Sequence, residues 1–112
     1  MRLGLGVMMT SLVFGGLGTV SVRAEDLSYT LVLQDHRFQP SQLEIPAGQK
    51  VRLVIQNLDT VTEEFDSPDL HREKLVAPGT TGVMMIGPLN PGRYNFTGEF
   101  HAETAAGLLV VK

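Results

Sequence analysis

The chain has 112 residues, no cysteine, nine Lys and Arg against twelve Asp and Glu, and a formal net charge of −3 at pH 7. This length fits one domain with a single hydrophobic core. Without cysteine there are no disulfides and no thiolate chemistry. An acidic chain without a basic run is also a poor partner for nucleic acid or anionic membranes, although it is compatible with cations.

Residues 1–24 have the pattern of a secretory signal. Arg2 is followed by a long apolar run, which ends in the letters VRA before a charged pair. We expect cleavage after Ala24 rather than a membrane anchor, because the run is short for a span of about 20 apolar residues and is rich in Gly and Thr. Cleavage would leave a periplasmic domain of residues 25–112, whose seven Lys and Arg against twelve Asp and Glu give a net charge of −5.

The rest of the chain reads as short strands separated by turns. Apolar residues alternate with polar ones, as in a strand with one buried face. The strands are predicted within residues 27–35, 41–49, 50–57, 63–67, 80–89, 93–98 and 106–112. Residues 69–79 are instead expected to form an irregular excursion or one helical turn. Seven or so short strands without a long helix predict an all-β, antiparallel β-sandwich.

Glu63 stands out in this pattern because it shares the parity of Phe65 in the segment EEFDS. That parity turns the carboxylate toward the interior, where an unpaired charge is costly. Glu63 is therefore expected to have a partner. A metal ion, Arg72, Lys74 or a backbone N–H would each serve.

Two long segments, FQPSQLEIPAGQKVRLVIQNLDTVTEEFDSPDL and LVAPGTTGVMMIGPLNPGRYNF, resemble the cupredoxin-like family, and the resemblance covers residues 30–112. It implies a Greek-key β-sandwich with a metal at one end. Ordinary members use His, Cys, His and Met as ligands. These positions fall on Glu63, Gly98, His101 and either Ala105 or Ala106. Blue-copper electron transfer is not expected here, because that chemistry depends on the thiolate.

The segment GEFHAETAAG resembles the cysteine-free, EfeO-type branch of the family. That branch comprises exported proteins that accompany bacterial ferrous-iron or other cation permeases, with sites built from carboxylates and histidine. Carboxylate and imidazole together suit Fe, Mn, Cu(II) or Zn rather than Cu(I). The strongest candidate ligands are Glu63, Glu99 and His101, and the weaker ones are Glu103, Glu64 and Asp66.

The direction of two candidate ligands and the roles of the other histidines, the methionines and Gly98 can also be predicted. Glu99 and His101 would point to one side if the local chain is extended. His71 is interpreted as a solvated loop residue and His36 as structural or exposed. The pair of methionines at 84 and 85 is assigned to core packing. Gly98, without a side chain, lets backbone and loop approach the site closely.

Three functions remain open on the sequence. The first is a periplasmic module that binds Fe²⁺, Cu²⁺ or Mn²⁺ and passes the ion to an inner-membrane iron or cation permease, or to another periplasmic metal-handling protein. The second is a ferroxidase-like redox partner of an iron permease, so the question of enzyme activity stays open, with binding favoured. The third is a metal-free interaction domain that kept the fold and lost the site.

Overall fold

The structure is a computed structural model that describes residues 27–112; the predicted signal and its cleavage site lie outside this part of the chain. The described residues form nine strands and one short 3₁₀ turn. These are β2 (Ser28–Gln34), β3 (Arg37–Gln39), β4 (Gln42–Ile45), β5 (Val51–Asn57), β6 (Glu63–Ser67), β7 (Arg72–Val76), β8 (Thr81–Ile86), β9 (Gly92–Gly98), η3 (Glu99–His101) and β10 (Ala106–Val111). No helix within this part of the chain is both long and apolar enough to cross a membrane.

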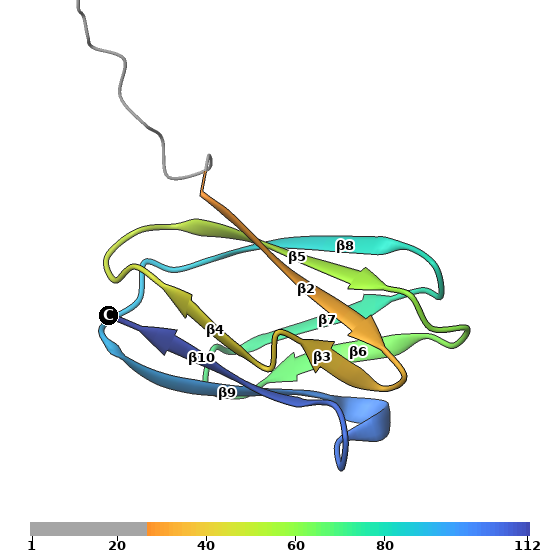
Figure 1. The fold of residues 1–112 in the computed structure, drawn as a ribbon. Helices are drawn as coiled ribbons and strands as arrows, with labels where there is room; N and C mark the ends of the chain where they lie inside the picture. Colours follow the sequence, from red (N-terminus) through yellow and green to blue (C-terminus); the bar gives the residue numbers. More distant parts are fainter. Residues whose placement is uncertain (1–26) are drawn as a thin grey trace, which may run out of the picture.

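The strands make two sheets that face each other, which confirms the predicted β-sandwich (Figure 1). One sheet has the order β4-β10-β9-β6-β7 and the other the order β3-β2-β5-β8. Two neighbouring pairs, β2 with β5 and β4 with β10, run parallel, and the remaining pairs are antiparallel. Alternation of apolar residues does not specify strand direction, so the parallel pairs were not foreseeable from that pattern.

The core lies between the sheets and follows the predicted alternation. Val51, Leu53 and Ile55 of β5 are all at most 2% exposed. The buried apolar side chains are Leu31, Leu33, Phe38, Ile45, Val51, Leu53, Ile55, Phe65, Leu70, Val76, Ile86, Phe96, Ala105, Leu109 and Val111. Met84 packs against this core from the partly buried face of β8, as expected.

The prediction of an irregular excursion or helical turn over residues 69–79 was wrong, because part of this segment is strand β7. It pairs with β6 along its whole length, from Ser67 opposite Arg72 to Glu63 opposite Val76. The reversal is tight: the N–H groups of Leu70 and His71 donate to the carbonyls of Ser67 and Pro68. The polar letters of REKLV conceal the strand, since only Val76 is fully buried. The other strand not anticipated as a separate element is β3.

The sandwich has two distinct ends. The η3 pole comprises the β2–β3 turn, the β5–β6 loop, the start of β6 and η3, on the right of Figure 1. The Lys112 pole, on the left, holds the start of β2 and the last residue. There the carbonyl of Leu27 accepts the Arg52 N–H at 2.8 Å, and the carbonyl of Lys112 accepts the Ala47 N–H at 3.2 Å.

Candidate metal centre

Three side chains that could bind a metal meet at the η3 pole. His36, Glu63 and His101 each offer a ligand atom, and these atoms lie within 4.8 Å of one another. His36 comes from the turn between β2 and β3, Glu63 is the first residue of β6, and His101 ends η3. The group therefore brings together three segments that are far apart in the sequence.

Glu63 is the buried centre of this group, only 2% exposed. Its Oε2 lies 2.6 Å from His101 Nδ1, and its Oε1 accepts the N–H groups of Phe100 at 2.9 Å and Glu64 at 3.0 Å. Three contacts of this kind offset the cost of burying a carboxylate. Backbone N–H groups are thus among its partners, as one of the predicted alternatives stated. Arg72 is not, since its guanidinium donates to the Met85 carbonyl.

His101 is held by the loop that carries it. The loop from Gly98 to Ala105 is closed by the Gly98 N–H, which donates to the Ala105 carbonyl at 2.7 Å. Within it the His101 carbonyl accepts the Ala105 N–H at 2.8 Å. The imidazole is 30% exposed, so one edge faces solvent while Nδ1 faces the Glu63 carboxylate.

His36 lies directly against His101. The two imidazole rings are stacked, with centroids 3.6 Å apart and planes 12° from parallel. Asp35 and His36 form the two-residue turn between β2 and β3, and both have positive φ, 54° and 57°. Such a pair of left-handed residues is the pattern of a type I′ hairpin turn. The turn thus projects the His36 ring toward the group.

Three aromatic rings pack together in the core next to the site. Phe38, Phe65 and Phe96 come from β3, β6 and β9, and their ring centroids are 5.1 to 6.3 Å apart. Phe38 is two residues after His36, and Phe65 is two residues after Glu63. Because strand side chains repeat every two residues on one face, the packing of Phe65 in β6 helps to set the inward direction of Glu63.

Gly98 makes room for the carboxylate. A Cβ at this position would lie 2.8 Å from Glu63 Cδ and 2.9 Å from both Glu63 Oε2 and the Ala105 Cβ. Any side chain at 98 would displace Glu63. The predicted close approach at Gly98 is therefore present, and the space beside the glycine is filled by the glutamate.

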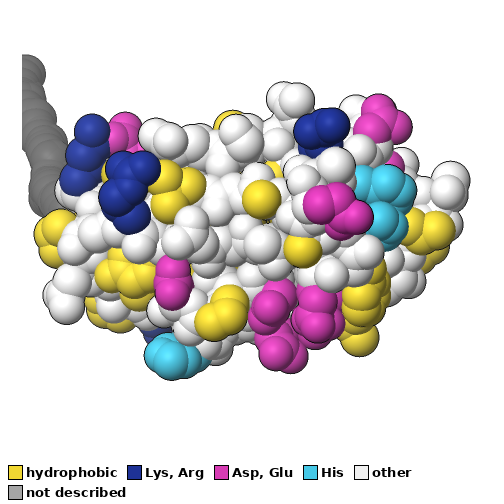
Figure 2. All heavy atoms as spheres, turned by 90° about the horizontal axis from the view of Figure 1, so that it is seen from below, with side chains coloured by type: hydrophobic (Ala, Val, Ile, Leu, Met, Phe, Trp, Pro, Cys, Tyr) yellow, Lys and Arg dark blue, Asp and Glu magenta, His cyan; other side chains and the backbone are white. Residues whose placement is uncertain are grey.

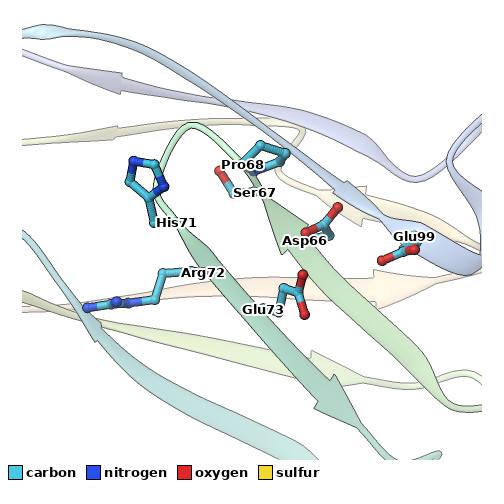
Figure 3. A pocket seen from close by; sticks show the side chains of 7 residues that line it. All are labelled: Asp66, Ser67, Pro68, His71, Arg72, Glu73 and Glu99. Carbon is cyan, nitrogen blue, oxygen red and sulfur yellow. The ribbon is translucent and has the colours of Figure 1, made fainter.

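The structure places the other predicted ligands elsewhere. Glu99 and Asp66 line a surface hollow of about 570 Å³ together with Glu73, His71 and Arg72. Figure 3 shows the three carboxylates of Asp66, Glu73 and Glu99 facing the same space. Among the weaker candidates, Glu103 is exposed in the turn after η3.

Glu99 and His101 were expected to share a side only in an extended chain, and this condition is not met. Both residues lie in the 3₁₀ turn η3. At about three residues per turn, side chains two positions apart point in different directions. Glu99 therefore faces the hollow, while His101 faces Glu63.

Glu64 neighbours the same acidic side chains. Its pKa is raised from the model-peptide value of 4.5, first by partial burial and then by a hydrogen bond with Glu99 and by the negative charges of Glu99 and Glu73. Like charges close together disfavour the ionised form. These carboxylates therefore form an acidic face on the outside of β6, β7 and the end of β9.

His36 is the member of the group that the sequence did not indicate. It precedes Glu63 by 27 positions, and its turn lies in the other sheet. The spacing His36-x-Phe38 resembles Glu63-x-Phe65, but the two-residue repeat of a strand does not extend to His36, which lies in a left-handed turn. Its position therefore depends on tertiary contacts.

The residues present fit a metal ion of intermediate hardness. Two imidazoles and one carboxylate give a nitrogen and oxygen donor set without sulfur. Such sets suit Cu(II), Zn and Fe, whereas Cu(I) prefers thiolate or thioether ligands. The carboxylate and the His101 ring are already oriented by hydrogen bonds before any ion binds.

Solved structures share this fold. A chain of a haem-copper terminal oxidase dimer gives a TM-score of 0.63 at 22% identity; the match covers 78% of this chain and 65% of that chain, which is just under two thirds. The metal-binding domain of the Cu(I)-exporting P-type ATPase CopA of Streptococcus pneumoniae, solved with Cu(I), gives a TM-score of 0.65 at 11% identity, covering 76% of this chain and 84% of that one. Both likenesses concern the fold alone.

Sequence comparison is more specific. An uncharacterized protein of Rickettsia prowazekii is 44% identical over 85 residues, which are 76% of this chain and 68% of that protein. The family model for the cupredoxin-like domain matches residues 7–111. The chain therefore belongs to the cupredoxin-like domain family.

Proposed function

We propose that the protein is an exported metal-binding module that holds one divalent ion through His36, Glu63 and His101. The observation that carries this proposal is the meeting of these three side chains around one buried carboxylate. The ion is copper, iron or manganese, and the module passes it to a membrane permease, as the resemblance to EfeO-type proteins implies.

The donor set narrows the choice of ion. The CopA domain that shares this fold was solved with Cu(I), but the group in this chain contains no sulfur. Cu(II) and Fe(II) match two imidazoles and a carboxylate better. The acidic face beside the site also raises the local concentration of cations. Both features favour capture of an oxidised copper ion or of ferrous iron over Cu(I).

One observation favours a second candidate, a metal-free interaction domain. The Glu63 carboxylate has a full set of partners without an ion: His101 Nδ1 and the N–H groups of Phe100 and Glu64. A buried carboxylate needs no metal when its hydrogen bonds are satisfied. The two candidates make opposite predictions for metal titration.

The test is calorimetric titration of the purified protein with Cu²⁺, Mn²⁺, Zn²⁺ and, under anaerobic conditions, Fe²⁺. We expect one ion per chain for at least one metal. His36→Ala, Glu63→Gln and His101→Ala should each weaken that binding by more than the roughly 10–100-fold that loss of an outer-shell partner costs. His71→Asn is the matched control, because His71 is exposed outside the group and asparagine tolerates its φ of +56°. This variant should bind as the parent does.

Circular dichroism on each variant separates loss of the site from loss of the fold. A flat titration for every ion by the folded parent protein would contradict the proposal and favour the interaction domain. Binding that survives both His101→Ala and Glu63→Gln would place the ion elsewhere in the molecule.

A further inference from the structure

We propose that Asp59 is the positioning residue of the metal centre: it fixes the His36 turn and the tautomer of the His36 ring. The inference rests on the proposed function, because the positioned ring is one of the three candidate ligands. Asp59 lies in the β5–β6 loop and is not part of the group itself. Three observations and one chemical consequence support this role.

The first is the unfavourable conformation of the turn. Asp35 and His36 have φ values of 54° and 57°, in a left-handed region that few non-glycine residues adopt. The Asp59 carboxylate accepts both of their N–H groups, with Oδ1 at 2.7 Å from Asp35 N and Oδ2 at 3.0 Å from His36 N. Hydrogen bonds to an ionised acceptor are the stronger kind. They hold the turn in this conformation.

The second is that Asp59 is itself held in place. Its N–H donates to Asn57 Oδ1 at 2.9 Å. Asn57 is fully buried, and its Nδ2 donates to the carbonyls of Val61 at 2.9 Å and Val76 at 3.0 Å. The Asp59 side chain is only 12% exposed. The carboxylate is therefore a fixed reference point that links the end of β5 to the turn in front of it.

The third is the environment of the His36 ring. Within residues 27–112, His36 Nδ1 is the buried side-chain nitrogen or oxygen that has no hydrogen-bond partner. Asp59 Oδ2 lies 3.5 Å from it, too far for a hydrogen bond but close enough for a strong electrostatic effect. A negative oxygen at this distance favours the proton on Nδ1.

The fourth is the chemical consequence of that tautomer. With the proton on Nδ1, the lone pair of Nε2 is free to bind an ion. A carboxylate behind a ligating histidine commonly sets which ring nitrogen binds the metal. His36 also stacks on His101. A fixed His36 ring therefore keeps these two candidate ligands close together. Asp59 would thus act on the site without touching the ion.

The first measurement needs no metal. A long-range ¹H–¹⁵N correlation spectrum of the ion-free protein reports the tautomer of each histidine. We expect the Nδ1–H form for His36 in the parent protein, and a loss of that preference in Asp59→Asn, where the negative charge is gone. An Nε2–H form in the parent protein would overturn the assignment.

The second measurement is a double-mutant cycle on metal affinity. Asp59→Asn should weaken binding by about 10–100-fold. If Asp59 acts through the His36 ring, the same change in a His36→Ala background should cause little further loss. An undiminished loss in that background, or parent-like binding by Asp59→Asn, would overturn the positioning role.

Asp69→Asn is the matched control. Asp69 is also a loop carboxylate that accepts a backbone N–H, that of Asn95 at 2.8 Å, but it lies in the β6–β7 turn. We expect it to lower stability without changing metal affinity or the His36 tautomer. Absence of binding by the parent protein would refute the proposed function alone, since the tautomer experiment would still decide what Asp59 does.

Discussion

The backbone of Gly98 lies directly against the Glu63 carboxylate, and this contact limits which side chains fit at positions 63 and 98. The carboxylate of Glu63 lies where a side chain at 98 would begin. The resemblance described above puts the cysteine ligand at position 98 and the first histidine ligand at position 63. We expect these two positions to be coupled in this chain, because the Glu63 carboxylate occupies the space that a Cβ at 98 would need.

Gly98→Ala should destabilise the protein by about 1–3 kcal/mol, the usual cost of overpacking a buried site. It should also weaken metal binding, since Glu63 must move. Urea unfolding and the metal titration measure the two effects. Gly92→Ala, in the same strand, is the control, because its Cβ would meet Tyr94 at an ordinary 3.5 Å. Equal stabilities for the two variants would contradict the shared space.

The β6–β7 hairpin is the element that carries Glu63 and closes one edge of its sheet. Its turn depends on His71, whose φ is +56°. Ser67 joins the turn to β9, because its Oγ donates to the Asn95 carbonyl at 2.6 Å and accepts the Leu70 N–H at 3.2 Å. The conformation of this turn therefore sets the position of β7 beside β6.

His71→Val should destabilise the protein by about 1–2 kcal/mol, because a β-branched residue is strongly disfavoured at positive φ. His71→Asn should be close to neutral, since asparagine tolerates this region. Thermal or urea unfolding of the two variants gives the comparison. Neither should change metal affinity. A loss of binding in His71→Asn would show that the histidine takes part in the site.

On the scale of the whole molecule, charge is distributed unevenly along the sandwich. Figure 2 shows a cluster of acidic side chains at the lower edge of one face, right of the middle, with most of the visible Lys and Arg side chains toward the Lys112 pole on the left. Among the carboxylates of β6 and β7, Glu64 has a pKa that is raised by partial burial and by the carboxylates of Glu99 and Glu73. The protein thus keeps several like charges together beside the candidate metal centre.

The repulsion between Glu64 and its neighbouring carboxylates lowers the free energy of unfolding at neutral pH. Because the pKa of Glu64 is raised in the folded protein, the folded state binds the proton more readily than the unfolded state does. The destabilisation is present above the raised pKa and disappears as the pH falls toward the ordinary value of 4.5. Glu64→Gln should therefore raise stability at pH 7, and the gain should shrink toward pH 4.

Urea unfolding of the parent and of Glu64→Gln at both pH values tests this. Glu44→Gln is the control, since that exposed carboxylate pairs with Lys112 and its removal should give no gain. A gain for Glu64→Gln that grows as the pH falls would have the wrong sign and would contradict the repulsion.

The fold was largely predictable because burial repeats every second residue in strands such as β5, where Val51, Leu53 and Ile55 form the inner face. The alternation does not reveal β7, whose exposed edge position allows polar residues along most of its length. Nor does it reveal strand partners, because pairing joins segments such as β4 and β10 that are far apart in the sequence.

The sequence indicated the residues of the candidate site only in part. Glu63 was indicated by strand parity and by family position, and His101 by family position alone; the structure places the two side chains 2.6 Å apart. Glu99 was a candidate on the condition of an extended chain, but it lies in a 3₁₀ turn. His36 depends on the hairpin turn, on Asp59 and on the packing of Phe38 against Phe65. These are tertiary contacts, and no local pattern in the sequence specifies them.

The position of Lys112, at the pole opposite η3, has a practical consequence for surface-based assays. A biotin or an affinity tag joined after Lys112 would fix the protein to a sensor chip by the end remote from His36 and His101 (Figure 1). The candidate metal centre would then face the flowing solution in every immobilised copy. Candidate permease fragments could be injected over this uniformly oriented layer, with and without each ion.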